Sequence, residues 1–317
     1  MRRVPDHLLQ AVVFLYPTLE TAIAGKGYGG SGFLVGMTAT DAFDPAGPPL
    51  RDPAHAYVVT NAHVAATCSY VRTSHPLQPI IRIEWWTNHP SGEDLAIAHV
   101  GILGVDTIAL GKVVHRSYFV TPEILETAQI GPGDQLFMTG RFTGLDERER
   151  TQATVRAGTL SIGSTVPVRN EALGVMQESF FAEVNSKAGY SGSPVYVEIP
   201  PELPWPSPTI GFPHRPPYLG LLGITWGIWR SFVPLLNSET HEPTGEAVIH
   251  ENSGIELVIP AWRIMEVLQD DRVIRHREQA VAAAERGQRT PKPGAVATSA
   301  QPLDDPLMPG PGGIEPP

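Results

Sequence analysis

Ala188-Gly189-Tyr190-Ser191-Gly192-Ser193-Pro194-Val195 is the stretch of this chain that decides its fold. A serine stands between glycines here and an apolar run follows, which is typical of a tight turn that leads into a β-strand. On such a turn the Ser191 hydroxyl is exposed, and its small neighbours let a carbonyl group approach backbone N–H groups. The stretch therefore predicts a nucleophilic serine at the start of a strand.

Such a hydroxyl needs a base within hydrogen-bond reach, and two upstream segments supply the partners. His63 ends the segment Thr60-Asn61-Ala62-His63, which follows an apolar run, so we expect it on a turn at a strand end. Asp94 directly precedes an alternating apolar run. Histidine titrates near neutrality, and a buried carboxylate fixes its tautomer and stabilises the imidazolium. We therefore take Ser191, His63 and Asp94 as candidate catalytic residues, and the N–H groups of Gly189 and Ser191 as candidate oxyanion donors.

Each assignment has a competitor. Glu93 and Asp106 compete with Asp94 for the role of the acid, but Asp94 directly adjoins the strand. Ser193 competes with Ser191, but it leads straight into Pro194 and the strand, where exposing its hydroxyl is harder. Taken singly, the motifs also fit a structural histidine, an ordinary loop acid and a plain Gly-Ser turn.

The composition limits the class of protein. With 317 residues, 42% of them hydrophobic, the chain is long enough to bury a large core in one domain or two lobes. Its net charge of −10 argues against a nucleic-acid or anionic-membrane surface. No apolar run reaches the length of about 18 residues that a membrane-spanning helix needs. We expect a protein or peptide as the partner, and the sequence leaves the oligomeric state open.

The single cysteine and the N-terminus bear on localisation. Cys68 allows no intramolecular disulfide, fits a reducing compartment and is better explained as a core residue than as a nucleophile. Arg2 and Arg3 precede the apolar run Leu8–Tyr16, so a signal peptide is the alternative to a first β-strand there. Pro5, Asp6 and His7 interrupt the lead-in to that run, which favours the strand and a cytoplasmic protein.

Short apolar or alternating runs separated by Gly, Pro, Asn and Asp predict an all-β protein. Asp41–Pro53 and Pro200–Pro217 are expected to be surface loops, and Asn237–Ser253 an irregular polar stretch. The expected strands are Ala11–Tyr16, Gly32–Gly36, Ala56–Thr60, Ile80–Trp86, Ala96–Val100, Gln135–Gly140, Thr154–Ile162, Ser179–Val184, Ser193–Glu198, Tyr218–Trp226 and Ile255–Val258.

The C-terminal part differs from this pattern. Ala261–Arg286 has apolar residues at near-helical spacing, which predicts one helix packed on the body. Residues 287–317 are rich in Pro, Gly and Ala, so we expect a disordered tail. The glycines of Gly25–Gly30 match a dinucleotide-binding pattern, but a strand rather than a helix follows them, so we expect a glycine-rich turn there. We expect no cofactor and no metal site.

Five motifs in this order make the chain resemble the trypsin/chymotrypsin-like serine peptidases, and their disulfide-free bacterial members more than the animal enzymes. The His, Asp and Ser of the three segments follow the order of that family. Ser31-Gly32-Phe33-Leu34-Val35 is similar to its opening strand, and Thr225-Trp226-Gly227 to its Ser-Trp-Gly. The resemblance covers about Leu8 to Leu268, and nothing after Leu268 has the length or pattern of a PDZ domain.

The resemblance implies two packed six-stranded antiparallel β-barrels with a C-terminal α-helix. Residues 1–286 would form the peptidase domain, with the first barrel at about 8–118, the second at about 119–260 and the helix at about 261–286. It implies further that Ser191 is the nucleophile, His63 the general base and acid, and Asp94 the orienting acid.

Four more residues gain implied roles. Thr225 would donate its hydroxyl to Asp94, and Trp226 and Gly227 would pair with the substrate backbone. Asn185 falls at the floor of the S1 pocket, where an acid would specify Arg or Lys, so such a preference is not supported. Tyr190 replaces the acid that pairs with a new N-terminus in animal relatives, which argues against activation by that salt bridge.

The sequence thus favours a serine endopeptidase that works through an acyl-enzyme. The alternatives are a catalytically silent binding module on the same fold, which the unusual Tyr190 and the Pro200–Pro217 segment motivate, and an esterase with the same acyl-transfer groups. Substrate preference and pathway are not readable from the sequence.

Overall fold

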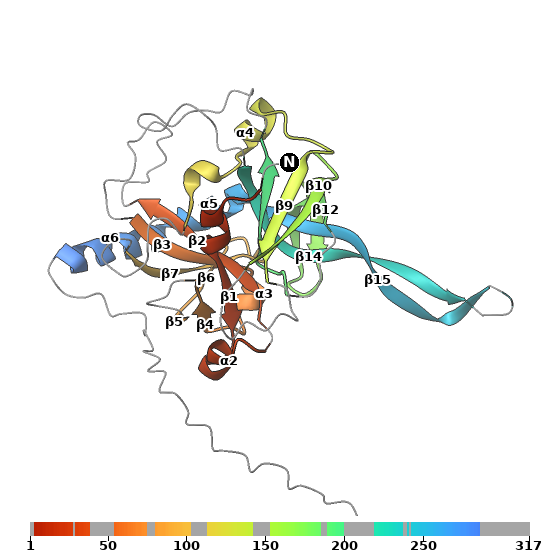
Figure 1. Ribbon diagram of the computed structural model, residues 1–317, viewed down its shortest axis with the longest axis horizontal. Coiled ribbons are helices and arrows are strands. Elements are labelled where there is room, and N and C mark those ends of the chain that lie inside the picture. The colour runs from red at the N-terminus through yellow and green to blue at the C-terminus, as the bar shows by residue number, and fades with distance from the viewer. Residues whose placement is uncertain are drawn as a thin grey trace, which may run out of the picture.

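The computed structural model describes residues 3–27, 29–38, 54–74, 80–102, 113–141, 153–184, 189–199, 219–236, 240 and 242–285. Two mainly antiparallel sheets form the body, and helices follow at the C-terminal end (Figure 1). This architecture confirms the expected all-β, two-barrel class with a helical C-terminal part. Asp106, Asn185, the segments 41–53 and 200–217 and the tail 287–317 lie outside the described residues.

The first sheet has eight strands in the order β5-β4-β1-β2-β3-β7-β6, with β8 paired in parallel to β2. It therefore has more strands than the six expected, and four of them, β4, β5, β6 and β8, are only two or three residues long. Its strands are β1 (Val12–Tyr16), β2 (Ser31–Thr38), β3 (Ala54–Thr60), β4 (Tyr70–Arg72), β5 (Ile80–Arg82), β6 (Thr87–Asn88), β7 (Ala96–Ile102) and β8 (Val114–His115).

The second sheet closes on itself. Its order is β10-β9-β13-β14-β15-β12-β11, and a further pairing of β10 with β12 completes a ring of six strands, as expected for a barrel. Its strands are β9 (Gln135–Gly140), β10 (Thr154–Leu160), β11 (Val166–Asn170), β12 (Val175–Glu183), β13 (Pro194–Glu198), β14 (Leu219–Leu236) and β15 (Pro243–Pro260).

Apolar side chains gather inside each sheet and between the two. Val13, Val58 and the buried thiol of Cys68 belong to the first interior, so Cys68 is a core residue. The second interior includes Met138 and Val195. A third cluster joins residues of both sheets with the C-terminal helix. The two sheets are thus held together over a shared apolar interface, which fixes residues of one sheet against those of the other.

The helices differ from the sequence-based expectation at both ends. The run from Leu8 begins as α1 (Asp6–Ala11), and the strand starts only at Val12. The single C-terminal helix is two, α5 (Ala261–Leu268) and α6 (Asp271–Glu285), separated by a short break. The other helices in the described residues are α2 (Leu19–Ala24), α3 (Ala62–Ala65), η2 (Arg116–Tyr118) and α4 (Pro122–Thr127).

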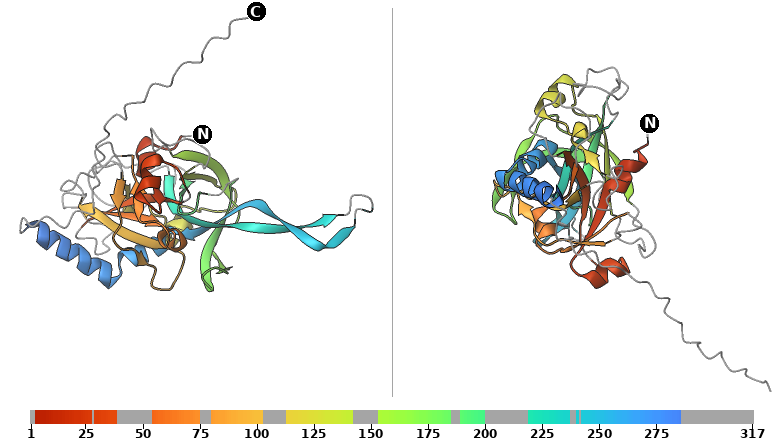
Figure 2. Two further views of the ribbon diagram at one scale, coloured as in Figure 1. Left: turned by 90° about the horizontal axis from the view of Figure 1, so that it is seen from below. Right: turned by 90° about the vertical axis from the view of Figure 1, so that its left-hand side faces the viewer.

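The largest correction concerns the segment expected to be irregular, Asn237–Ser253. Most of it belongs to β15, which pairs with β14 as far as Leu236 opposite Pro243. The two strands leave the body as a long twisted ribbon on the side opposite α6 (Figures 1 and 2). The prediction was wrong because it was based on the polar composition. A two-stranded ribbon outside the body buries little apolar surface and therefore needs no apolar face.

Candidate active site

His63 and Asp94 are in direct contact. His63 lies in α3, which begins where β3 ends, and Asp94 lies just before β7, the neighbour of β3. Asp94 Oδ2 is 2.6 Å from His63 Nδ1, and Asp94 Oδ1 accepts a hydrogen bond of 2.9 Å from the His63 backbone N–H. The Asp94 side chain is 2% exposed, whereas that of His63 keeps 41% of its surface. The carboxylate therefore orients a ring that still reaches solvent.

Hydrogen bonds from two directions hold Asp94. Its N–H donates to Gln177 Oε1 at 2.7 Å, and Gln177 comes from β12 of the second sheet. Its carbonyl accepts from Asn61 Nδ2 at 2.9 Å. Gln177 and Asn61 are buried and were not among the residues singled out by sequence. Asn61 does lie within the His63 motif, but Gln177 has no sequence signal, because its role depends on how the two sheets meet.

The Ser191 turn is held across the sheets by one residue of the first sheet, Ser31. The N–H of Ser31 donates to the Ser191 carbonyl at 2.8 Å, and its hydroxyl donates to the Gly189 carbonyl at 3.0 Å. The same hydroxyl accepts from the N–H of Arg141 at 3.0 Å. Ser31 is completely buried. It fixes both peptides that flank Tyr190 and Ser191, and thus positions the candidate nucleophile.

Glycines allow the turn to come close to the His63 segment. A Cβ on Gly192 would lie 2.0 Å from the Ser31 carbonyl oxygen and 2.6 Å from Thr60 Oγ1. A Cβ on Gly30 would lie 2.7 Å from the Val64 side chain and 3.0 Å from the Ser191 carbonyl oxygen. Gly30 thus sits between Val64, the neighbour of His63, and Ser191. The absence of side chains at these two glycines brings the serine segment against the histidine segment.

The two serines of the turn have different environments. Ser193 is completely buried, and its Oγ lies among buried atoms with no hydrogen-bond partner in the described part of the chain. Ser191 is half-buried. Within the described residues, the N–H groups of Gly189 and Ser191 donate to no acceptor. Ser191 is therefore the more exposed of the two serines, as expected for the candidate nucleophile.

Tyr190 points into the second barrel. Its side chain is 2% exposed, its hydroxyl lies 2.5 Å from Thr154 Oγ1, and the Arg156 guanidinium lies over its ring at 5.1 Å. Tyr190 thus contributes to the core of the second sheet.

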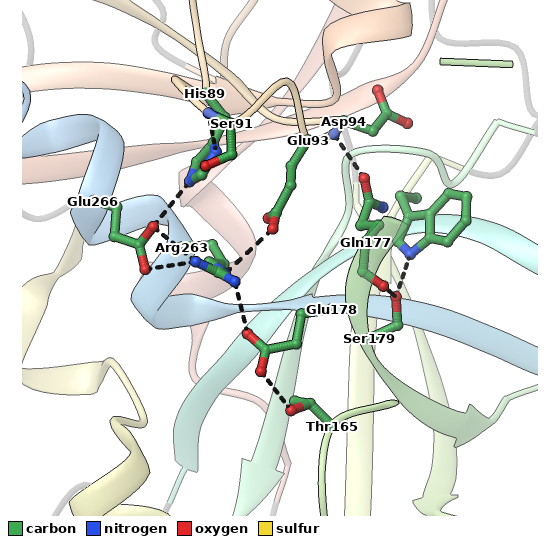
Figure 3. Close-up of polar contacts among 11 residues, drawn as sticks. His89, Ser91, Glu93, Asp94, Thr165, Gln177, Glu178, Ser179, Arg263 and Glu266 are labelled. Atoms are coloured by element: carbon green, nitrogen blue, oxygen red, sulfur yellow. Dashed lines mark hydrogen bonds and ion pairs between the residues drawn. The ribbon is translucent and has the colours of Figure 1, made fainter. Parts of the chain in front are cut away.

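Glu93, the competitor of Asp94, belongs to a separate ionic cluster (Figure 3). Arg263 of α5 forms ion pairs with Glu93 at 3.4 Å, Glu178 of β12 at 3.1 Å and Glu266 at 2.9 Å. Burial raises the pKa of Glu93 to about 7, although the Arg263 guanidinium opposes the shift. His89 Nε2 lies 3.2 Å from Glu266 Oε2, and its Nδ1 accepts from the Ser91 N–H. Arg263 therefore ties the 89–94 loop, Asp94 included, to the second sheet.

Thr225 does not bond to Asp94 as expected. Its hydroxyl donates to Glu256 of β15 in a short hydrogen bond. Burial raises the pKa of Glu256 to about 7, although this hydrogen bond opposes the shift. The replacement has a physical reason: an O–H donates once, and β14 and β15 place Glu256 within reach. Gln177 of β12 does contact Asp94, but through the Asp94 backbone N–H and not through the carboxylate.

The substrate-strand candidates lie at an irregular point of β14. The register with β15 shifts between Thr225 and Gly227, so Trp226 occupies a bulge. Trp226 Nε1 donates to Ser179 Oγ at 3.0 Å. A Cβ on Gly227 would meet nothing within 4 Å, so the main chain there is open on that side. Trp226 and Gly227 thus lie where another strand can approach.

Two further findings concern the described residues only. No group of three or more His, Cys, Asp and Glu side chains among them is arranged to hold a metal ion. None of the helices in this part of the chain has the length and apolar character to cross a bilayer.

No protein-family model and no curated protein matches the chain. Solved structures that are similar to it include a protease of M. tuberculosis, Rv3671c. Its inactive form is 13% identical, with 83% of this chain and 89% of that chain covered and a TM-score of 0.43. Its active form is 15% identical, with 83% and 81% covered and a TM-score of 0.43.

Proposed function

We propose that this protein is a serine endopeptidase that cleaves peptide bonds through Ser191, His63 and Asp94. The observation that carries the proposal is the contact between Asp94 Oδ2 and His63 Nδ1 at 2.6 Å, next to a glycine turn that bears a reachable serine. A carboxylate on Nδ1 leaves Nε2 as the nitrogen that can accept a proton from a hydroxyl. This arrangement supports an acid–base role for His63 better than a structural one.

The proposed course has two halves. Ser191 Oγ attacks the substrate carbonyl while His63 Nε2 takes the hydroxyl proton, and Asp94 stabilises the imidazolium that forms. The N–H groups of Gly189 and Ser191 bind the oxygen of the tetrahedral intermediate. His63 then gives its proton to the leaving amine, and an acyl-enzyme on Ser191 remains. Water, with His63 as base, hydrolyses that ester and restores the free hydroxyl.

The protein should be active as made. The side chain of Tyr190 is enclosed by the second barrel and bonded to Thr154, so a newly cut N-terminus has no acid to pair with on the turn. The turn is instead fixed by Ser31 from the first sheet. We therefore propose that the oxyanion donors are in place without a cleavage event.

A peptide-library cleavage profile on the purified protein tests the function. We expect cleavage at internal bonds with a defined side-chain preference, and its loss in Ser191→Ala. Ser193→Ala is the matched variant, since it removes a hydroxyl on the same turn that a substrate cannot reach. Cleavage of ester substrates with no peptide cleavage would indicate an esterase, and binding without Ser191-dependent cleavage a silent module.

A further inference from the structure

β14 continues far beyond the barrel that it helps to build. β13 pairs with it from Leu219 to Ile224, and β14 then runs on to Leu236. β15 covers the opposite edge along the whole ribbon. Among the described residues, no strand follows β13 on the edge that it leaves. At about 3.3 Å per residue, the edge of β14 from Gly227 to Leu236 extends over about 30 Å without a strand partner in the described part of the chain.

This edge begins at the candidate nucleophile. The N–H of Gly192 donates to the Thr225 carbonyl at 2.9 Å, and the N–H of Thr225 donates to the Ser193 carbonyl at 3.0 Å. These bonds join the Ser191 turn to β14 at the residue where β13 departs. A peptide whose scissile carbonyl lies at Ser191 therefore has one side of its chain next to the start of the free edge.

The direction of such a peptide follows from the sheet. β13 and β15 are both antiparallel to β14, and a strand that takes over the place of β13 does best in the same sense. β14 runs away from Ser191, so an antiparallel peptide runs toward it. The residues before the scissile bond would then lie along the ribbon.

The side chains near the base of the ribbon favour this edge over the other one. Trp229 is 46% exposed, and its ring lies 5.5 Å from that of Phe181 in β12. Every second residue of β12 lies on the same face of the strand, which puts Phe181 on the face of Ser179 and Gln177. Gln177 is the residue that accepts the hydrogen bond from the Asp94 N–H. An exposed aromatic ring thus stands on the face that carries the site. On the β15 side, the Val184 N–H already occupies the Gly254 carbonyl at 2.9 Å.

We propose that the β14 edge beyond Gly227 binds the segment before the scissile bond as an added antiparallel strand, so that the substrate is an extended, unfolded polypeptide segment. The inference rests on the proposed function for the position of the cleaved bond. Folded loops cannot supply so long an extended segment. The protein would therefore cleave unfolded or flexible chains well and compact domains poorly.

The test is a series of peptides with one cleavage site and about 4, 7 or 10 residues before it. We expect kcat/KM to rise by about tenfold or more from the shortest to the longest peptide. Two variants test the ribbon: Trp229→Ala, and one with residues 230–252 replaced by Asn-Gly. In both, the ratio of kcat/KM for the longest peptide to kcat/KM for the shortest should fall toward one. Each variant is its own reference, and labelling of Ser191 by a fluorophosphonate shows that it is folded.

Backbone methylation identifies pairing as the cause. In an added strand, alternate N–H groups point at β14 and the others point away. Two versions of the ten-residue peptide are N-methylated at every second residue far from the cleavage site, one at the odd and one at the even positions. The version whose methyl groups point at β14 should lose the increase in kcat/KM, and the other should keep it. Equal kcat/KM for all lengths, or an equal effect of both methylation patterns, would overturn the inference while the peptidase assignment stands.

A binding measurement separates this inference from the function. If the wild type cleaves nothing, fluorescence anisotropy with the ten-residue peptide and Ser191→Ala still tests the edge. If the peptide binds, and only one of the two methylation patterns abolishes binding, the inference about the β14 edge is supported although the peptidase function is not. Failure to bind any long peptide, or a ribbon-dependent dimer in its place, would overturn the inference.

Discussion

The two halves of the site are built by different means. The histidine half relies on side chains: Asp94 on the imidazole, Gln177 and Asn61 on the main chain of Asp94, and Arg263 on its loop. The serine half relies mainly on close main-chain packing: the Ser31 N–H donates to the Ser191 carbonyl, and Gly192 lies against the Ser31 carbonyl. The Ser31 hydroxyl adds one side-chain bond, to the Gly189 carbonyl. A side-chain contact can be removed alone by a substitution, whereas a side chain added to the packed main chain would collide with its neighbours and displace the whole turn. Changes in the histidine half should therefore have graded effects, and changes in the serine half all-or-none effects.

The largest effect is expected from Gly192→Ala. Gly192 has φ +87°, and its new Cβ would lie 2.0 Å from the Ser31 carbonyl oxygen, so the turn must leave the first sheet. We expect no measurable turnover and a clearly lower Tm, as assayed by peptide cleavage and thermal unfolding.

Gly174→Ala is the matched control for that change. Gly174 has φ +71° but nothing within 4 Å of the new Cβ, so only backbone strain of about 1 kcal/mol applies. Its turnover should stay at the wild-type level. Similar damage from both substitutions would mean that packing at Gly192 is not what positions the serine.

The next effect concerns Asp94→Asn, which keeps the volume of the side chain but removes the charge and one acceptor from His63. We expect kcat to fall about 10⁴-fold with a change in Tm of only a few degrees. Asp134→Asn serves as the control, since Asp134 accepts from the Gly131 N–H away from the site. A kcat that changes less than tenfold in Asp94→Asn would remove Asp94 from the mechanism.

Arg263→Ala should have a smaller effect, because Arg263 acts on the Asp94 loop from outside. We expect kcat to fall by about tenfold, KM to stay nearly constant, and the free energy of unfolding to fall by about 1–3 kcal/mol. The exposed pair Arg169–Glu171 provides the control, since Arg169→Ala should cost under about 1 kcal/mol and leave kcat unchanged. In the double variant Arg263→Ala/Glu93→Gln, the loss should be less than additive.

The smallest effect is a pH dependence of stability from Glu93. Because the pKa of Glu93 rises from 4.5 to about 7 on folding, the folded state binds more protons than the unfolded state between these values. The free energy of unfolding should therefore fall as the pH rises through this window, by up to about 3 kcal/mol. Glu93→Gln should remove this part of the slope in urea titrations. The pKa of Glu256 is also raised to about 7, so Glu256 contributes to the slope in both the wild type and Glu93→Gln. The difference in slope between these two proteins therefore reports on Glu93 alone.

The same contrast explains what the sequence could predict. The all-β class was predictable because strand patterns are local, and the His63–Asp94 pairing because the motifs around both residues resemble those of a peptidase family. Ser31, Gln177 and Arg263 could not be assigned their positions, because their partners lie on other sheets or helices far along the chain. The predicted hydrogen bond from Thr225 to Asp94 was wrong for the same reason, because Thr225 donates to Glu256, which the pairing of β14 with β15 brings within reach.

The ribbon marks the limit of pattern-based prediction. Residues 237–253 lack the apolar alternation by which a half-buried strand is recognised. That alternation reports burial against a core, and a ribbon outside the body has little core to face. In contrast, the first part of β14 is buried in the barrel and was predicted from its apolar run.

The most direct test of the central claim is covalent labelling by a fluorophosphonate, followed by mass spectrometry of the labelled peptide. The claim is that Ser191 is a hydroxyl activated by His63 and Asp94. It predicts one adduct on Ser191, none in Ser191→Ala, a much slower reaction in Asp94→Asn, and normal labelling in Ser193→Ala. Equal labelling of wild type and Ser191→Ala, or an adduct on Ser193, would contradict it.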